Sequence, residues 1–240
     1  AIRNLYDPYL GVFNRLEHYI AMNSVPEKCE VILQGGTFPF APKLYQDYFV
    51  KYLLKAMNDF SRMFYNENGI DLDKFNEFFE LPANIDNEKR TERLQKKLWF
   101  IKNLDFGDKK VLDDVNHLFF NNKNNMRYDD LNNNKKITNN IKNNEFKNNK
   151  SNENNSNPNI AAMKRVLAKV NEQNDQNISL EQVQKENETA RIRCIGLTIE
   201  TMSDYGKLVH GNQMLRLGCT RVEIGIQSIY DEVLEKTNRG

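Results

Sequence analysis

Two kinds of hydrophobic pattern alternate towards the two ends of the chain. In the first, apolar residues recur every three or four positions, which is typical of an amphipathic helix. In the second, short apolar runs rich in β-branched residues favour a buried strand of a parallel sheet. The predicted elements are a helix from Pro8, a strand in 29–34, a long helix after Pro42, helices in 160–170 and from Leu180, a strand in 193–200, a short helix ending near Gly218, a strand in 220–227 and a helix in 229–238.

Capping residues mark where several of these helices begin. Asp7 precedes Pro8, so an N-cap is followed by proline at the first helical position. Ser179 and Gln182 form a capping box that Ile178 and Val183 staple, and Ser228 is the predicted cap of the last helix. The predicted buried faces are Val12, Phe13, Leu16 and Tyr19 on the first helix, and Tyr45, Phe49, Leu53, Met57, Phe60 and Phe64 on the long one.

This alternation predicts the fold class. Repeated strand–helix units form an α/β fold with a parallel sheet, either open or closed into a barrel. Three strands are too few to close a barrel, and the alternation of strands and helices begins and ends partway through the series of strand–helix units. We therefore expect the chain to be part of a larger α/β protein. We also expect no signal peptide and no membrane span, because no apolar run approaches the ~20 residues that a spanning helix requires.

The middle of the chain differs in composition. Nearly half of the residues in 121–159 are asparagine, and few are apolar, which predicts a disordered insertion rather than an array of ligands. The preceding stretch places Leu94, Leu98 and Ile101 at helical spacing, with Trp99 interpreted as a packing residue. The predicted division is therefore a first globular part in 1–65, an insertion in 66–177 and a second globular part in 178–240.

Charge, cysteine and histidine content give no support for several functions. The formal net charge is +1, so no overall basic field predicts nucleic-acid binding. Three widely separated cysteines, Cys29, Cys194 and Cys219, argue against a disulfide framework and for a reducing compartment. The three histidines are also scattered, so a zinc site built from this chain is not expected.

Candidate ligand-binding residues follow each predicted strand. Ligands of parallel α/β proteins bind at the carboxyl ends of strands. The first strand is followed by Gly35, Gly36 and Thr37, the second ends at Glu200 and the third runs into Gln227. A tight turn with two capping residues explains the same pattern about equally well. The glycines match neither the dinucleotide fingerprint nor the P-loop, so binding of that kind is not supported.

Five sequence blocks carry a resemblance to a known family. They are YDPY in 6–9, KCEVILQGGTF in 28–38, YQDYF in 45–49, RCIGLTIET in 193–201 and the long block in 214–240. In this order they resemble the radical S-adenosylmethionine (SAM) domain of the catalytic subunit of Elongator and its archaeal and bacterial relatives. The resemblance covers 1–65 and 186–240, and it implies part of a TIM-like barrel interrupted by the Asn-rich insertion.

The resemblance also implies a function. The family consists of tRNA uridine-34 acetyltransferases, which join this barrel to an acetyltransferase domain and start the carboxymethyl modification of the wobble uridine. The implied activity is that of a tRNA carboxymethyluridine synthase of the radical SAM type. The implied cofactors are SAM and a [4Fe–4S] cluster, with acetyl-CoA as co-substrate. The implied partners are the tRNA anticodon stem-loop and other Elongator subunits, with no membrane. The location is cytoplasmic, with a nuclear pool as the alternative.

Several residues match family positions at the methionyl end of SAM. Gly35, Gly36 and Thr37 match the motif that holds the methionyl amino group. Glu200 matches an acidic residue that faces the same end of SAM. The resemblance therefore assigns these four residues to cofactor binding.

Three further residues match family positions. Gln227 matches the glutamine that faces the SAM ribose, and Arg239 matches an arginine suited to the SAM carboxylate through its planar fork. Lys28 matches a lysine before the first strand and is a candidate substrate-binding residue. The resemblance identifies no catalytic residue in this chain.

The chain also departs from the family pattern. The family's cluster cysteines lie before Tyr6, so we expect no metal ligand in this chain, and its cysteines are too scattered to form a [4Fe–4S] site. Residues 202–206 read MSDYG where the family has an arginine, a proline and a cysteine. No acetyltransferase domain is recognised in the chain. We therefore expect the 240 residues alone to be inactive.

Two functions remain open from the sequence. The first is a segment of an Elongator-type enzyme, in which arginines supply a local patch for tRNA phosphates. The second is a degenerate barrel that docks tRNA or partner subunits without SAM chemistry. A cysteine triad encoded before Ala1 would favour the enzyme, and its absence would favour the scaffold. The candidate phosphate contacts are Arg191, Arg193, Arg216 and Arg221, each of which is also typical of a solvated or salt-bridged surface.

Overall fold

The computed structural model describes residues 4–83, 87–120 and 178–238. The described residues form two compact units, one within 1–70 and 178–240 and the other within 71–177. The sequence-based boundary lies after residue 65, whereas the first unit continues through a short hairpin of β2 (Tyr65–Asn66) and β3 (Gly69–Ile70). The Asn-rich tract and the helix predicted in 160–170 lie outside the described residues.

A three-stranded parallel sheet forms the centre of the first unit. The strand order is β1-β4-β5, so the two segments on either side of residues 71–177 pair directly. The register aligns Leu33 with Ile199 and Ile199 with Val222. The predicted α/β class with three adjacent parallel strands is confirmed. The strands are β1 (Lys28–Leu33), β4 (Arg193–Met202) and β5 (Arg221–Gly225).

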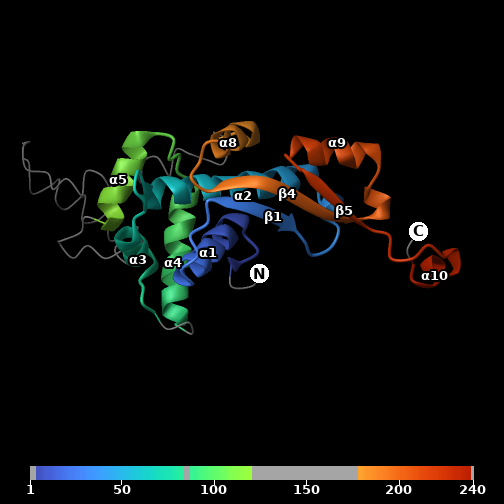
Figure 1. Ribbon diagram of the computed structural model, residues 1–240, viewed down its shortest axis with the longest axis horizontal. Helices are drawn as coiled ribbons and strands as arrows, with labels where there is room; N and C mark the ends of the chain where they lie inside the picture. The colour runs from blue at the N-terminus through green and yellow to red at the C-terminus, as the bar shows by residue number, and fades with distance from the viewer. Residues whose placement is uncertain (1–3, 84–86, 121–177, 239–240) are drawn as a thin grey trace, which may run out of the picture. The chain divides into compact units, whose positions relative to one another are not determined.

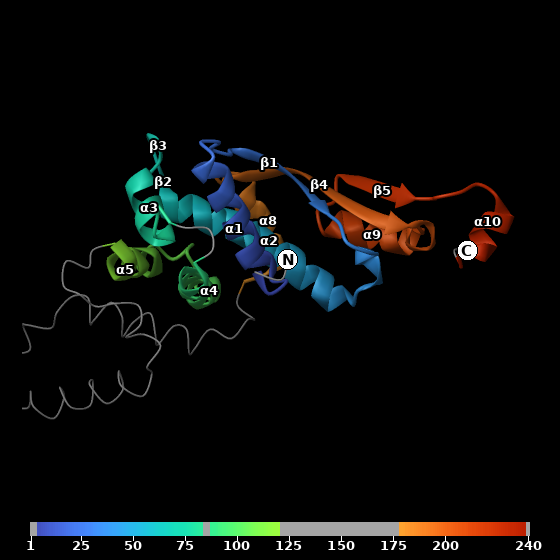
Figure 2. The ribbon, with the colours of Figure 1, turned by 90° about the horizontal axis from the view of Figure 1, so that it is seen from below.

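Helices cover one face of this sheet. Figure 2 shows α1, α2, α8 and α9 on one side of the strands, and in Figures 1 and 2 α10 stands apart beyond β5. Leu197 and Ile199 of β4 are buried on the covered side. The helices are α1 (Pro8–Ala21), α2 (Lys43–Phe64), α8 (Leu180–Asn187), α9 (Leu208–Arg216) and α10 (Asp231–Lys236), and the short 3-10 helices are η2 (Phe38–Phe40) and η4 (Ser203–Tyr205).

The prediction that all three strands are buried is wrong for the two edge strands. Leu33 is the only buried residue of β1, and no residue of β5 is buried. Each edge strand has a neighbour on one side only, and the described helices cover one face of the sheet. Apolar runs in β1 and β5 therefore leave side chains such as Ile32 and Ile224 exposed.

The predicted helix caps are confirmed in two of three cases. The Asp7 carboxylate accepts hydrogen bonds from the backbone N–H groups of Tyr9 at 3.0 Å and Leu10 at 3.1 Å. The Ser179 hydroxyl accepts one from the Gln182 N–H at 3.1 Å. The cap at Ser228 is wrong, because its hydroxyl accepts from the Tyr230 N–H within a turn and α10 begins only at Asp231.

On α1 and α2, the residues that are buried differ in part from those that the sequence predicts. On α1, Val12 is half-buried and Tyr19 exposed, because the stripe that faces α2 runs through Tyr9, Phe13, Leu16 and Ile20. On α2, Leu53, Met57, Phe60 and Phe64 are buried as predicted, whereas Tyr45 and Phe49 in the first turns are not.

A buried polar network links α1 to α2. Lys55 and Asp59 form an ion pair one helical turn apart, and the Tyr9 hydroxyl donates a hydrogen bond of 2.9 Å to the same Asp59 carboxylate. All three residues are buried. Burial raises the pKa of Asp59, and the neighbouring Lys55 opposes that shift. Burial also raises the pKa of Tyr9 well above 10, with a further contribution from the Asp59 charge.

We expect the stability of the first unit to fall above pH 10. The native state keeps the Tyr9 proton at a pH where the unfolded chain, with a pKa near 10, loses it. The contribution is full below pH 10 and is lost as the pH rises towards the folded-state pKa. Tyr9→Phe should flatten the pH dependence of unfolding between about pH 10 and 12, as followed by circular dichroism. Burial raises the pKa of Tyr65 to about 12, so part of the pH dependence should remain in this variant. If stability fell with pH as steeply in Tyr9→Phe as in the unmodified protein, Tyr9 would not be a source of the pH dependence.

The second unit consists of three helices in its described residues. Leu94, Leu98 and Ile101 are buried at the predicted spacing. Trp99 does not fill this core, because it is 41% exposed and the Lys102 ammonium lies over its ring. The helices are α3 (Leu72–Phe79), α4 (Glu88–Lys102) and α5 (Lys109–Phe120). Across the described ranges of both units, no helix has the length and apolarity needed to cross a bilayer.

Candidate ligand pocket at the strand ends

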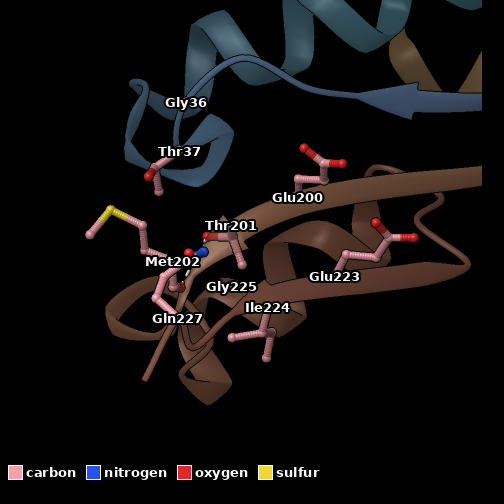
Figure 3. A pocket seen from close by; sticks show the side chains of 9 residues that line it. All are labelled: Gly36, Thr37, Glu200, Thr201, Met202, Glu223, Ile224, Gly225 and Gln227. Atoms are coloured by element: carbon pink, nitrogen blue, oxygen red, sulfur yellow. Dashed lines mark hydrogen bonds between the residues drawn. The ribbon is translucent and has the colours of Figure 1, made fainter. Parts of the chain in front are cut away.

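A cavity of about 510 Å³ opens at the carboxyl ends of the three strands. Figure 3 shows its lining residues, which come from the loop after β1, the end of β4 and the end of β5. The sequence predicts ligand-binding residues at this edge, and four of them do meet here. The lining residues are Gly36, Thr37, Glu200, Thr201, Met202, Glu223, Ile224, Gly225 and Gln227.

The wall after β1 depends on two glycines. Gly35 and Gly36 have φ angles of +106° and +110°, a region that residues with a Cβ rarely adopt. Gly36 and Thr37 line the cavity, whereas Gly35 does not. Gly35 therefore shapes the turn, and the backbone at Gly36 forms the surface that a ligand can approach.

Carboxylates form the second wall. The Gln34 side chain donates a hydrogen bond of 2.9 Å to Glu200, which comes from the end of β4. Glu200 is paired in register with Glu223 of β5, so two carboxylates stand side by side on neighbouring strands (Figure 3). The two negative charges repel each other. The Arg221 Nε atom lies 3.4 Å from the Glu223 Oε1 atom and offsets part of this repulsion. The pair makes this edge suited to a cationic group.

Gln227 completes the rim in a strained conformation. Its φ angle is +71°, which is uncommon for a residue other than glycine and is typical of functional turns. Its amide lies directly against Gly225, where an added Cβ would be 2.7 Å from the Gln227 Nε2 atom. Gly225 therefore makes room for the amide at the cavity wall.

Two predicted site residues are not in this cavity, and one cannot be placed. Lys28 begins β1, opposite Arg193, at the other end of the sheet from the cavity. Gly35 is adjacent to the cavity without lining it. Arg239 lies outside the described residues. Residues 202–206 depart from the family pattern. In this segment, Met202 lines the cavity, and the ring of Tyr205 packs against that of Phe40 with 5.8 Å between the ring centroids.

Sequence reasoning missed Glu223 and Gln34. The available signal for Glu223 was strand alternation, because it stands two residues before Gly225 in a strand that ends at the same edge. Gln34 directly precedes the glycine pair, but its bond to Glu200 depends on the β1–β4 register, which one sequence does not fix.

The cysteines do not fit an iron–sulfur cluster. Cys29, Cys194 and Cys219 are free, and none of them lines the cavity. Within residues 4–83, 87–120 and 178–238, no three His, Cys, Asp or Glu side chains are grouped as metal ligands. A [4Fe–4S] cluster needs a compact set of thiolates. The described part of this chain therefore supplies no cluster site.

Comparisons with known proteins confirm the resemblance seen in the motifs. The chain is 53% identical over 78 residues to the tRNA uridine(34) acetyltransferase of Methanocaldococcus infernus, a match that covers 32% of this chain and 14% of that protein. It is 49% identical over 61 residues to Elongator complex protein 3 of Schizosaccharomyces pombe, covering 25% of this chain and 11% of the relative. No protein-family model matches the chain.

The matched regions are short parts of long proteins. The chain spans 14% of the archaeal relative and 10% of Elongator complex protein 3 of Drosophila melanogaster, to which it is 55% identical over 53 residues. A solved structure of Methanocaldococcus infernus Elp3 with an N-terminal deletion gives a TM-score of 0.48 at 25% identity, covering 98% of this chain and 28% of that one. The evidence for the α/β class of this chain is its own three-stranded parallel sheet.

Proposed function

We propose that this chain is part of an Elongator-type tRNA uridine-34 acetyltransferase and forms a section of its SAM-binding barrel. One observation carries the proposal. Gly36, Thr37, Glu200 and Gln227, which the motif resemblance selects from three separate blocks, line a single cavity at the strand ends. The high local identity to proteins named tRNA uridine(34) acetyltransferase and Elongator complex protein 3 supports the same assignment.

The cavity fits SAM in size and chemistry. Its volume of about 510 Å³ lies within the range of small-molecule sites. SAM carries an ammonium and a sulfonium, which suit the carboxylates of Glu200 and Glu223, and the Gln227 amide can bond a ribose hydroxyl. The backbone at Gly36 allows close approach, and Arg239 is proposed to bind the SAM carboxylate. When bound in a radical SAM enzyme, SAM supplies radical chemistry.

Other parts of the activity are proposed to come from outside the described residues. The cluster ligands would be cysteines that precede Tyr6 in the parent protein, and acetyl-CoA would bind an acetyltransferase domain. The tRNA anticodon stem-loop and other Elongator subunits are the proposed partners. Of the four candidate phosphate contacts, Arg216 pairs with Asp47 and Glu181, and Arg221 lies beside Glu223. Arg193 is half-buried. Arg191 is exposed, donates to the backbone carbonyl of Asn66 at 3.2 Å and is the best of the four candidates for a phosphate.

A non-catalytic scaffold is the second candidate function. The observation that favours it is the departure of residues 202–206 from the family pattern, because Met202 of this segment lines the cavity. In that case the cavity would remain as a structural feature, and the protein would dock tRNA or partner subunits without using SAM.

Deleting the encoding gene and measuring modified wobble uridine in total tRNA by nucleoside mass spectrometry tests the proposal. We expect the carboxymethyl-derived nucleosides to disappear, and an allele carrying Gly36→Val to behave in the same way. Valine cannot adopt a φ of +110° without strain of about 1–3 kcal/mol, so the cavity wall should be rebuilt. Gly11→Val is the matched control, because an added Cβ meets no atom within 4 Å at either position, whereas Gly11 lies in α1 and lacks the positive φ of Gly36.

The two candidate functions give different results in this experiment. Normal modification in the deletion strain would reject both. Loss in the deletion strain with full modification in the Gly36→Val strain, at equal protein level, would reject the SAM site and leave the scaffold.

A further inference from the structure

Two free cysteines are paired across the sheet at the end opposite the cavity. Cys29 of β1 and Cys194 of β4 are direct register partners, although they are far apart in the sequence. Both are half-buried and free. The third cysteine, Cys219, is buried, and its Sγ donates to the backbone carbonyl of Arg221 at 3.0 Å. Cys29 and Cys194 therefore stand together in a way that their sequence positions do not suggest.

The geometry of a parallel ladder brings these two residues within bridging range. Neighbouring strands lie roughly 4.8 Å apart. Disulfides join Cα atoms separated by about 4.4–6.8 Å. The register of β1 against β4 shifts between Cys29 and Glu30, so the strand pairing is irregular directly after Cys29. We expect Cys29 to be the cysteine that moves when the bridge closes. Cys194 is held in place, because its N–H donates to the side-chain oxygen of the buried Asn187 at 2.8 Å.

We propose that Cys29 and Cys194 form a redox-responsive dithiol, which closes to an intramolecular disulfide by exchange with a low-molecular-weight disulfide. The thiolate of one cysteine attacks a sulfur of that disulfide, forms a mixed disulfide and releases one small thiol. The thiolate of the second cysteine then attacks the protein sulfur of the mixed disulfide and releases the other small thiol. Two protein thiols lose two electrons in total, and one small disulfide is reduced to two thiols.

The bridge is expected to be slow to form and easy to reduce. Burial raises the pKa of Cys29 and raises that of Cys194 to about 11, so few thiolates exist at neutral pH. The Cβ atoms of a disulfide lie about 3.8 Å apart, closer than the strand spacing, so closure strains the sheet. Strained bridges are more readily reduced and are typical of regulatory disulfides. Such a bond is compatible with a reducing compartment, where protein disulfides are transient.

Peptide mass spectrometry after exchange tests this proposal. The chain is incubated with excess oxidised glutathione in mildly alkaline buffer, and the monomeric product is alkylated and digested. We expect a cross-linked peptide pair containing Cys29 and Cys194 as the main product, which dithiothreitol removes. The Cys219→Ser variant should give the same pair, because Cys219 takes no part. The Cys29→Ser variant should leave Cys194 only as a mixed disulfide with glutathione.

Three results would overturn the proposal. One is mixed disulfides on both Cys29 and Cys194 without a bridge between them. A second is a bridge that involves Cys219, and a third is a Cys29–Cys194 link found only between two chains. None of these outcomes bears on the SAM proposal, because neither cysteine lines the cavity.

Discussion

Asp59→Ala is expected to destabilise the packing of α1 on α2 by about 3–5 kcal/mol, the cost of removing one partner of a buried ion pair. Asp59 is 1% exposed and accepts contacts from Lys55 and from the Tyr9 hydroxyl. Alanine removes the carboxylate that balances the Lys55 ammonium in a buried environment. Amide hydrogen exchange along α2 measures the effect, because it reports the opening free energy of this helix separately from the second unit.

Two further variants test whether the loss of stability comes from leaving a buried charge without its partner or simply from losing an ion pair. Asp47 pairs with Arg216 on the surface, so Asp47→Ala should cost only about 0–1 kcal/mol. The double variant Lys55→Met with Asp59→Leu removes both charges and should be less destabilised than Asp59→Ala. If Asp59→Ala and Asp47→Ala had the same small effect, the buried Lys55 ammonium would not depend on Asp59 for compensation of its charge.

The sequence predicted the elements of the first unit well, because local signals decide where they begin. Asp7 with Pro8 and Ser179 cap their helices as expected. Burial of the edge strands was predicted wrongly, because an apolar run does not reveal whether a second layer covers it. The error at Ser228 has a similar cause: a serine hydroxyl can satisfy a turn as well as a helix end, and periodicity does not distinguish them.

The candidate site could be predicted in part because parallel strands bring their carboxyl ends to one edge. Glu200 and Gln227 follow different strands and still line one cavity. The contributions of Gln34 and Glu223 depend on register, which pairs β4 with β1 on one side and with β5 on the other. Strand alternation could have indicated Glu223, but register is a tertiary property. Residue spacing alone therefore could not show that Glu223 pairs with Glu200 or that Gln34 bonds Glu200.

Glu200→Gln is expected to weaken SAM binding about ten- to a hundredfold in the parent protein reconstituted with iron and sulfide. The substitution keeps the size of the side chain but removes the charge that is proposed to face the cationic groups of SAM, and hydrogen bonds to charged groups contribute about 1.5–3 kcal/mol. Isothermal titration calorimetry with SAM measures the change. Gln34→Leu, which removes the amide that holds Glu200 at 2.9 Å, should cost less, about 0.5–1.5 kcal/mol, because the carboxylate itself remains.

Glu30→Gln is the matched control for this measurement. Glu30 lies on the same sheet but opposite Gly196, away from the cavity, so its variant should bind SAM as the unmodified protein does. Equal affinity of the Glu200→Gln and Glu30→Gln proteins would remove Glu200 from the site, even if SAM binds elsewhere. A graded loss, largest for Glu200→Gln and smaller for Gln34→Leu, would instead indicate that Gln34, directly after β1, positions the Glu200 carboxylate for the ligand.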